Sequence, residues 1–182
     1  MAAPVRAKGG IGMSEPFALC VSVSIHASSL EAWWGTELVA PHNWSDWDVL
    51  APQAADFSLW QHFTGARVAS VLNDILDSGR REGSVMERHT NGRMELVALL
   101  ATENWREQLL ILGALRMLEG FGATDGWALM HDYVFERGGT AWALHFPPVG
   151  RAALLGDTPA DLKSEADALV LPFLEAARAR TD

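Results

Sequence analysis

The first structured segment of the chain alternates hydrophobic and small polar residues with a period of two. Between residues 17 and 26, the alternate positions that begin at Phe17 are all apolar, whereas those that begin at Ala18 are small or polar. This alternation is typical of a strand, because neighbouring side chains point to opposite faces. The pattern therefore predicts a strand over residues 17–26 with one face in the core.

A helical region and a loop follow this strand. The run Ser-Ser-Leu-Glu from Ser28 has the spacing of a capping box and predicts a helix to about residue 38. Residues 41–52 lie between two prolines and are rich in Asn, Ser and Asp, which indicates a loop. Helical spacing returns over residues 56–76, and the Ser-Gly pair at 78–79 is expected to end that helix.

The clearest local signal is Asn91-Gly92, which lies between two segments of strand-forming residues. Asn-Gly readily takes the positive φ angles of a type I′ turn, so we expect a hairpin over residues 84–101. A helix capped by Thr102 should follow, because apolar residues cover a wide arc of the segment up to Leu118.

A second hairpin is expected over residues 126–146, with its turn at Gly138-Gly139. This register places Asp132 opposite His145 on neighbouring strands. Thr158-Pro159 then begins a final helix, which Pro172 should kink or divide.

The order of these elements is typical of an α+β fold. The first six resemble the ferredoxin-like β-α-β-β-α-β arrangement, over residues 17 to 146. We therefore predict a ferredoxin-like core with an extra C-terminal strand and helix, and a mainly antiparallel sheet covered by helices on one face. Residues 1–13 are expected to be a flexible tail, with Met13 a candidate native start, and residues 14–182 a single domain.

Composition supports a globular protein and limits its partners. The 182 residues are 49% hydrophobic, and 14 Lys and Arg stand against 23 Asp and Glu, a net charge of −9. This acidic balance argues against nucleic acid and allows a basic protein partner. No apolar run has the ~18 residues of a membrane span, so no membrane contact is expected. Cys20 is the only cysteine, which favours a reducing, cytoplasmic setting.

Tryptophan is concentrated in and around the loop at residues 41–52. Five of the eight tryptophans fall between Trp33 and Trp60. Loops often carry function, and tryptophan is enriched at binding hot spots. We therefore predict a partner-binding site made of Trp44, Asp46, Trp47 and Asp48. The alternative is a loop that packs down as a lid on the core edge.

Chemical motifs are sparse in this sequence. The histidines show no spacing typical of a metal site, and no nucleophile motif occurs, so we predict no metal, no cofactor and no catalytic residue. The polar groups that a ligand cleft could use are His42, His62, Asp132 and His145.

Three functional hypotheses follow. The first is a non-catalytic protein-binding domain, such as a bacterial toxin-neutralising (immunity-type) inhibitor. The second is a small-ligand-binding protein or enzyme with a cleft between the sheet and the helical region. The third is a subunit that forms a homodimer through its sheet.

Overall fold

The computed structural model describes residues 17–39, 44–50, 65–133 and 139–179. Of Trp47 and Asp48 it describes the backbone only. The elements, with 3₁₀ helices labelled η, are β1 (Phe17–Ser24), α1 (Ala27–Gly35), η2 (Trp47–Leu50), α3 (Val68–Glu82), β2 (Val85–Thr90), β3 (Arg93–Thr102), α4 (Trp105–Arg116), η4 (Met117–Phe121), β4 (Thr124–His131), β5 (Thr140–Phe146), β6 (Ala153–Leu155) and α5 (Ala160–Arg178).

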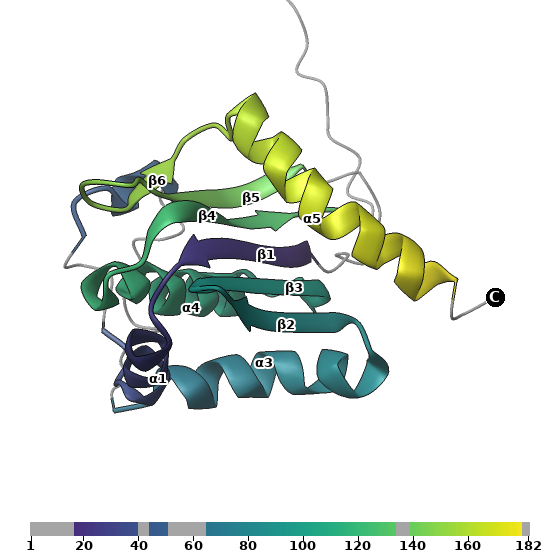
Figure 1. The fold of residues 1–182 in the computed structure, drawn as a ribbon, viewed down its shortest axis with the longest axis horizontal. Coiled ribbons are helices and arrows are strands. Elements are labelled where there is room, and N and C mark those ends of the chain that lie inside the picture. Colours follow the sequence, from purple (N-terminus) through teal and green to yellow (C-terminus); the bar gives the residue numbers. More distant parts are fainter. Residues whose placement is uncertain (1–16, 40–43, 51–64, 134–138, 180–182) are drawn as a thin grey trace, which may run out of the picture.

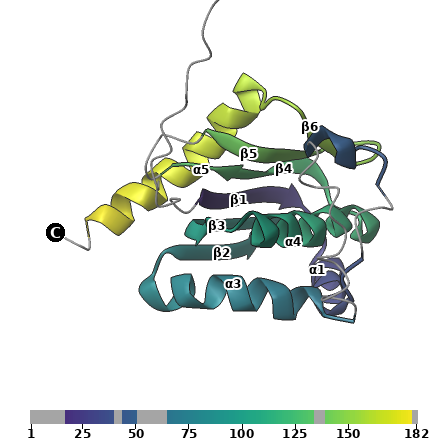
Figure 2. The same cartoon turned by 180° about the vertical axis from the view of Figure 1, so that it is seen from behind.

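The strands form one open antiparallel sheet in the order β2-β3-β1-β4-β5-β6. The α+β class and the antiparallel sheet are therefore confirmed. Helices α1, α3 and α4 lie on one face, and α5 crosses the other face (Figures 1 and 2). Strand β2 forms one edge of the sheet, and its last four residues are exposed.

The prediction that helices cover one face of the sheet is wrong. Helix α5 buries Leu162, Ala166, Val170 and Leu174 against the second face. The reason lies in the strands. Strand β1 buries Leu19 and Val21 on the first face, which α1, α3 and α4 cover, and it also buries Ala18 and Cys20 on the second face, which α5 covers. A sheet that is apolar on both sides needs a cover on both sides.

The hairpin at Asn91-Gly92 is confirmed. Both residues have positive φ, 53° and 76°, and β2 pairs with β3 on either side of the turn. The turn is also tied to the end of β1, because the Ile25 amide donates to the Gly92 carbonyl at 2.8 Å.

The register predicted for the second hairpin is wrong. His145 pairs with Trp127, not with Asp132, and β4 ends at His131. Asp132 donates its amide to the Gly139 carbonyl at 3.0 Å, whereas Gly138, the other residue of the predicted turn, lies outside the described residues. In the observed register, apolar side chains of β4 and β5 lie side by side on the first face of the sheet. The two glycines alone could not reveal this register, because it depends on which side chains must share a face.

Helix ends also differ from their predictions. Helix α1 begins at Ala27, after His26, so Ser28 does not cap it. Helix α3 continues through Gly79 and ends at Gly83, which has φ +73°. Gly79 is needed for packing, because a Cβ there would lie 2.7 Å from Val85 Cγ2. Asn104, not Thr102, caps α4, and Thr102 accepts the Asn104 amide.

Candidate functional site

The structure places half of the predicted loop site against the body of the protein. Asp46 accepts a hydrogen bond from the Leu154 amide at 2.8 Å, and its carboxylate lies 3.0 Å from Arg116 Nη1. Trp44 is half-buried against the core, with Arg116 Cζ 6.0 Å from its ring centroid. These two side chains therefore fasten the loop to α4 and β6, as the lid alternative expects.

The other predicted positions are only partly described. Trp47 and Asp48 begin η2, but their side chains lie outside the described residues, as do His42 and His62. Partner binding by the loop therefore stays a prediction.

The predicted Asp132–His145 pair does not form. Asp132 is buried just after β4, whereas His145 lines a small pocket of about 110 Å³ with Arg93, Asp125 and Glu165. The difference in hairpin register separates them.

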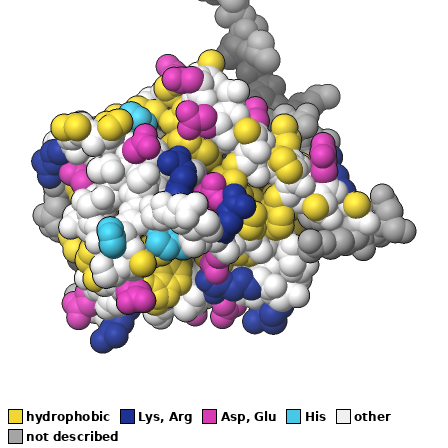
Figure 3. Space-filling model, in the orientation of Figure 1, with side chains coloured by type: hydrophobic (Ala, Val, Ile, Leu, Met, Phe, Trp, Pro, Cys, Tyr) yellow, Lys and Arg dark blue, Asp and Glu magenta, His cyan; other side chains and the backbone are white. Residues whose placement is uncertain are grey.

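A larger apolar hollow lies between α1 and the β2–β3 hairpin. We call it the α1–β2 groove; its volume is about 400 Å³, and it is lined by Leu30, Glu31, Trp33, Trp34, Glu87, Arg88, His89, Met94, Glu95 and Leu96. Met94 and Leu96 belong to the first face of the sheet, and the two tryptophans come from α1. Figure 3 shows hydrophobic side chains exposed beside histidines at the end of the molecule that holds α1.

The walls of the α1–β2 groove are held in place by hydrogen bonds. The buried Trp33 donates its indole N–H to the Ala114 carbonyl of α4 at 2.9 Å. The Trp34 ring lies against it, with centroids 5.2 Å apart at 51°. His89 Nε2 lies 3.0 Å from the Ile25 carbonyl and joins β2 to the start of α1. A partner would therefore meet a site that is already formed, which lowers the entropic cost of binding.

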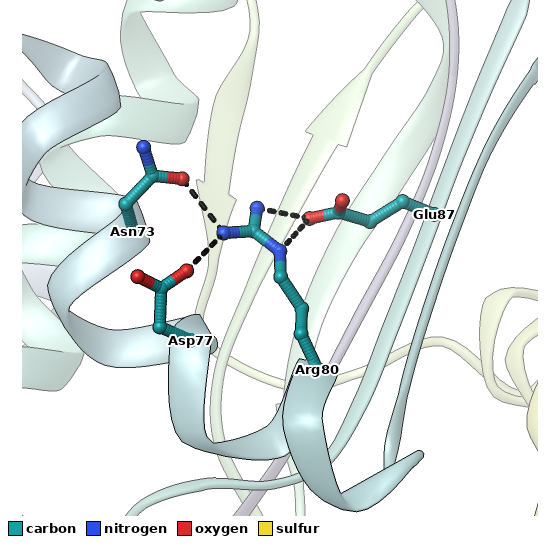
Figure 4. A network of polar contacts seen from close by, with 4 residues as sticks. All are labelled: Asn73, Asp77, Arg80 and Glu87. Atoms are coloured by element: carbon teal, nitrogen blue, oxygen red, sulfur yellow. Dashed lines mark hydrogen bonds and ion pairs between the residues drawn. The ribbon is translucent and has the colours of Figure 1, made fainter.

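Most charges at the rim of this groove are already paired. Arg80 of α3 binds Glu87 through two nitrogens, at 2.6 and 3.2 Å, and also contacts Asn73 and Asp77 (Figure 4). Arg88 forms an ion pair with Glu95. Within the described part of the chain, Glu31 is the rim carboxylate that has no such pair.

A second polar region lies on the opposite face of the sheet, under the first turns of α5. Lys163 Nζ is 2.5 Å from Asp167 Oδ1 and 4.7 Å from the Tyr133 ring centroid. His131 packs edge-on against Tyr133 at 4.6 Å, and its Nδ1 lies 2.8 Å from Thr140 Oγ1. We call these five residues the Lys163 cluster.

Several groups in the Lys163 cluster have shifted pKa values. Burial and the Lys163 charge lower the pKa of His131, which keeps the imidazole neutral at pH 7. Burial opposes ionisation of Asp167, but Lys163 and the nearby Tyr133 hydroxyl outweigh it, so the Asp167 pKa is lowered. The Tyr133 hydroxyl makes no well-aligned hydrogen bond, and burial, together with the adjacent Asp167, raises its pKa.

A polar cavity of about 560 Å³ adjoins the Lys163 cluster. Lys163 and Thr140 line it, together with Asp157 and Thr158 from the segment that precedes α5. Strand β6 pairs only with Ala143–His145 of β5, so among the described residues Thr140–Trp142 have no strand partner on the side of the cavity. We call this space the Lys163 cavity.

Comparisons with known proteins found no match, either to a protein-family model, to a curated protein or to a solved structure. The described helices include none that is long and apolar enough to cross a bilayer. Among the same residues, no group of three His, Cys, Asp or Glu side chains could hold a metal ion.

Sequence reasoning missed both the α1–β2 groove and the Lys163 cluster. The tryptophans of α1 were visible as part of the tryptophan-rich region, but nothing local showed that they face the β2–β3 hairpin. His131 and Tyr133 were visible as alternate residues near one strand end. Their contact with Lys163 depends on the face that α5 covers, which the sequence pattern did not reveal.

Proposed function

We propose that this protein is a non-catalytic protein-binding domain and that the α1–β2 groove receives an apolar side chain of its partner. The observation that carries the proposal is the apolar cavity of about 400 Å³, floored by Met94 and Leu96 and walled by Trp34. Interface hot spots are typically large side chains that fill such pockets, and tryptophan is enriched among them.

The neighbouring edge strand favours a protein over a small molecule as the occupant. Residues Glu87 to Thr90 of β2 are exposed beside the groove, on the side of the sheet where no described strand pairs with β2. An extended peptide can add to such an edge through main-chain hydrogen bonds and place alternate side chains in an adjacent pocket. The groove then supplies specificity and the edge supplies affinity.

Charge suggests that the partner is basic. The chain has a net charge of −9, and Glu31 stands at the groove rim with no ion pair among the described residues. A lysine or arginine next to the apolar anchor would pair with Glu31, and the acidic protein would speed the encounter. An inhibitor that neutralises a basic bacterial toxin in the cytoplasm would fit these properties.

Two finer structural proposals accompany this function. The strand order β2-β3-β1-β4, with helices between β1 and β2 and between β3 and β4, supports a ferredoxin-like core to which β5, β6 and α5 are added.

Trp47 and Asp48 could extend the contact with the partner from the predicted loop site. Helices cover both sheet faces, so a homodimer formed through the sheet would have to use one of its edges, of which β2 is the longer exposed one, and a solution-mass measurement tests this.

The proposal is tested by retention of proteins on the immobilised chain, followed by affinity measurement with the purified partner. Trp34→Ala and Glu31→Lys should each weaken binding by at least about tenfold, because they remove the anchor wall and reverse the free charge. Leu171→Ala is the control, since Leu171 is an exposed apolar residue on α5, away from the groove. A partner that binds all four proteins equally would rule out the groove as the site.

A further inference from the structure

We propose that the Lys163 cavity is a second, independent binding site and that it takes a small zwitterion of the α-amino acid class. This site lies at the β5–β6 edge of the sheet, between η2 and the start of α5, and its lining takes Leu50 and Trp142 from the first face and Ala143 and Leu155 from the second. Its volume of about 560 Å³ lies within the range of small-molecule sites in proteins.

The charges in the cavity lining define the ligand. Among the described residues that line it, Lys163 is the one cation and Asp157 the one anion, and the other described lining residues are hydroxyl-bearing, apolar or glycine. A ligand with one ammonium and one carboxylate group matches this set, whereas a simple anion or a simple cation would satisfy only one of the two. The net charge of −9 further disfavours a simple anion.

The position of Lys163 is fixed before any ligand arrives. Its ammonium has three donors, and Asp167, which does not line the cavity, takes one of them at 2.5 Å. The Tyr133 ring lies 4.7 Å from the same nitrogen and supports the charge through a cation–π contact. The remaining donors are available to a ligand carboxylate, with the Thr140 hydroxyl beside them.

Asp157 is placed to receive the ammonium group. It is exposed and forms no ion pair or hydrogen bond through its side chain among the described residues. It belongs to the short segment between β6 and α5 and lies six residues before Lys163 along the chain. In addition, the lining residue Trp142 is 2% exposed, and its indole N–H has no hydrogen-bond partner. Buried donors of this kind are usually satisfied in proteins.

The test is calorimetric titration of the full chain with the twenty common L-amino acids, each tested alone at pH 7.5. Sodium acetate and ethylamine hydrochloride serve as probes for the two halves of the zwitterion. We expect at least one amino acid to bind, and acetate and ethylammonium to bind at least about tenfold more weakly. Absence of binding by every amino acid, or acetate binding as tightly as the best of them, would overturn the proposal.

Two variants then locate the site. Asp157→Asn should weaken amino acid binding by at least about tenfold and should fold normally, because Asp157 has no partner to lose among the described residues. Lys163→Gln should weaken amino acid binding by a similar factor, and circular dichroism would confirm that α5 remains folded in this variant. Unchanged amino acid affinity in Asp157→Asn would show that the ligand does not bind in the Lys163 cavity. Glu31→Lys should leave amino acid binding intact, so failure of this proposal and failure of the α1–β2 groove are separable.

Discussion

The α1–β2 groove and the Lys163 cavity are opposite kinds of surface at opposite edges of one sheet. The groove has an apolar floor and walls, and its rim charges are mostly cancelled by ion pairs with neighbouring elements. The cavity has hydroxyl groups and one charge of each sign, next to a cluster whose pKa values are shifted. The first is suited to burying a side chain and the second to orienting a small polar molecule. The comparison teaches that the two edges of one sheet can hold hollows of opposite chemistry, according to which elements cover them.

The largest effect is expected at Gly126, because β4 packs there directly against the backbone of the central strand β1. A Cβ at this position would lie 2.1 Å from the Ser22 carbonyl oxygen of β1, which is fixed backbone. Gly126→Ala should therefore lower the free energy of unfolding by at least about 4 kcal/mol. Chemical denaturation would measure this loss. Gly120→Ala is the control, since a Cβ there meets nothing within 4 Å; equal stability of the two variants would show that the sheet adapts at Gly126.

Replacement of Trp33 should damage the groove and spare the cavity. The indole is fully buried and donates to Ala114, so Trp33→Ala should cost about 3 kcal/mol or more. Trp34→Ala, at the half-buried neighbour, should cost clearly less. Urea unfolding gives both values, and amino acid titration of the two variants shows whether the Lys163 cavity still binds. A larger loss for Trp34 than for Trp33 would contradict the proposed roles of these residues.

The Arg80 network should contribute a smaller amount. Arg80→Ala removes the contacts with Asn73, Asp77 and Glu87, and with them the link between α3 and β2. The expected loss is about 1 kcal/mol, because the side chain is partly exposed and solvent screens its charges. Arg81→Ala is the matched control on an exposed neighbour. Equal unfolding midpoints for the two variants would show that the network does not stabilise the groove wall.

The smallest expected effect is a dependence of folding stability on pH, which His131 of the Lys163 cluster should cause. The pKa of His131 is below its usual value of 6.5 in the folded protein, so below pH 6.5 the unfolded chain binds more protons. Stability should therefore fall as the pH drops from 7.5 to 5.5, although the Asp167 and Asp132 carboxylates partly oppose the shift. His131→Gln should lose less stability over the same range. An equal loss, measured by urea midpoints at both pH values, would exclude His131 as the cause.

Structural features that depend only on residues adjacent in the sequence could be predicted from the sequence. The Asn91-Gly92 turn needs only two residues that accept positive φ, and the first strand needs only its own alternation. The register of β4 with β5 was not predictable, because it depends on which side chains meet Trp142 and Leu144 on the first face. Helix α5 could be recognised as a helix, but its choice of face depends on Cys20 and Leu129, which lie far away in the sequence.

The same distinction applies to the candidate sites. Trp44 and Asp46 were correctly noticed as unusual residues in a loop, but the sequence could not show that Asp46 lies beside Arg116. The α1–β2 groove and the Lys163 cavity arise where segments distant in sequence meet. Their residues carry no motif, so only the folded chain brings them together.

The position of α5 in the chain has a consequence for biosynthesis. All six strands are translated before Ala160–Arg178, so the nascent sheet exposes the face that contains Ala18, Cys20 and Leu129 until the last helix emerges. Such a transiently exposed apolar surface favours aggregation and chaperone capture. A chain that stopped before α5 would keep this surface open and would become a substrate for cellular quality control. Helix α5 is thus the element whose docking closes the last apolar face of the newly made sheet.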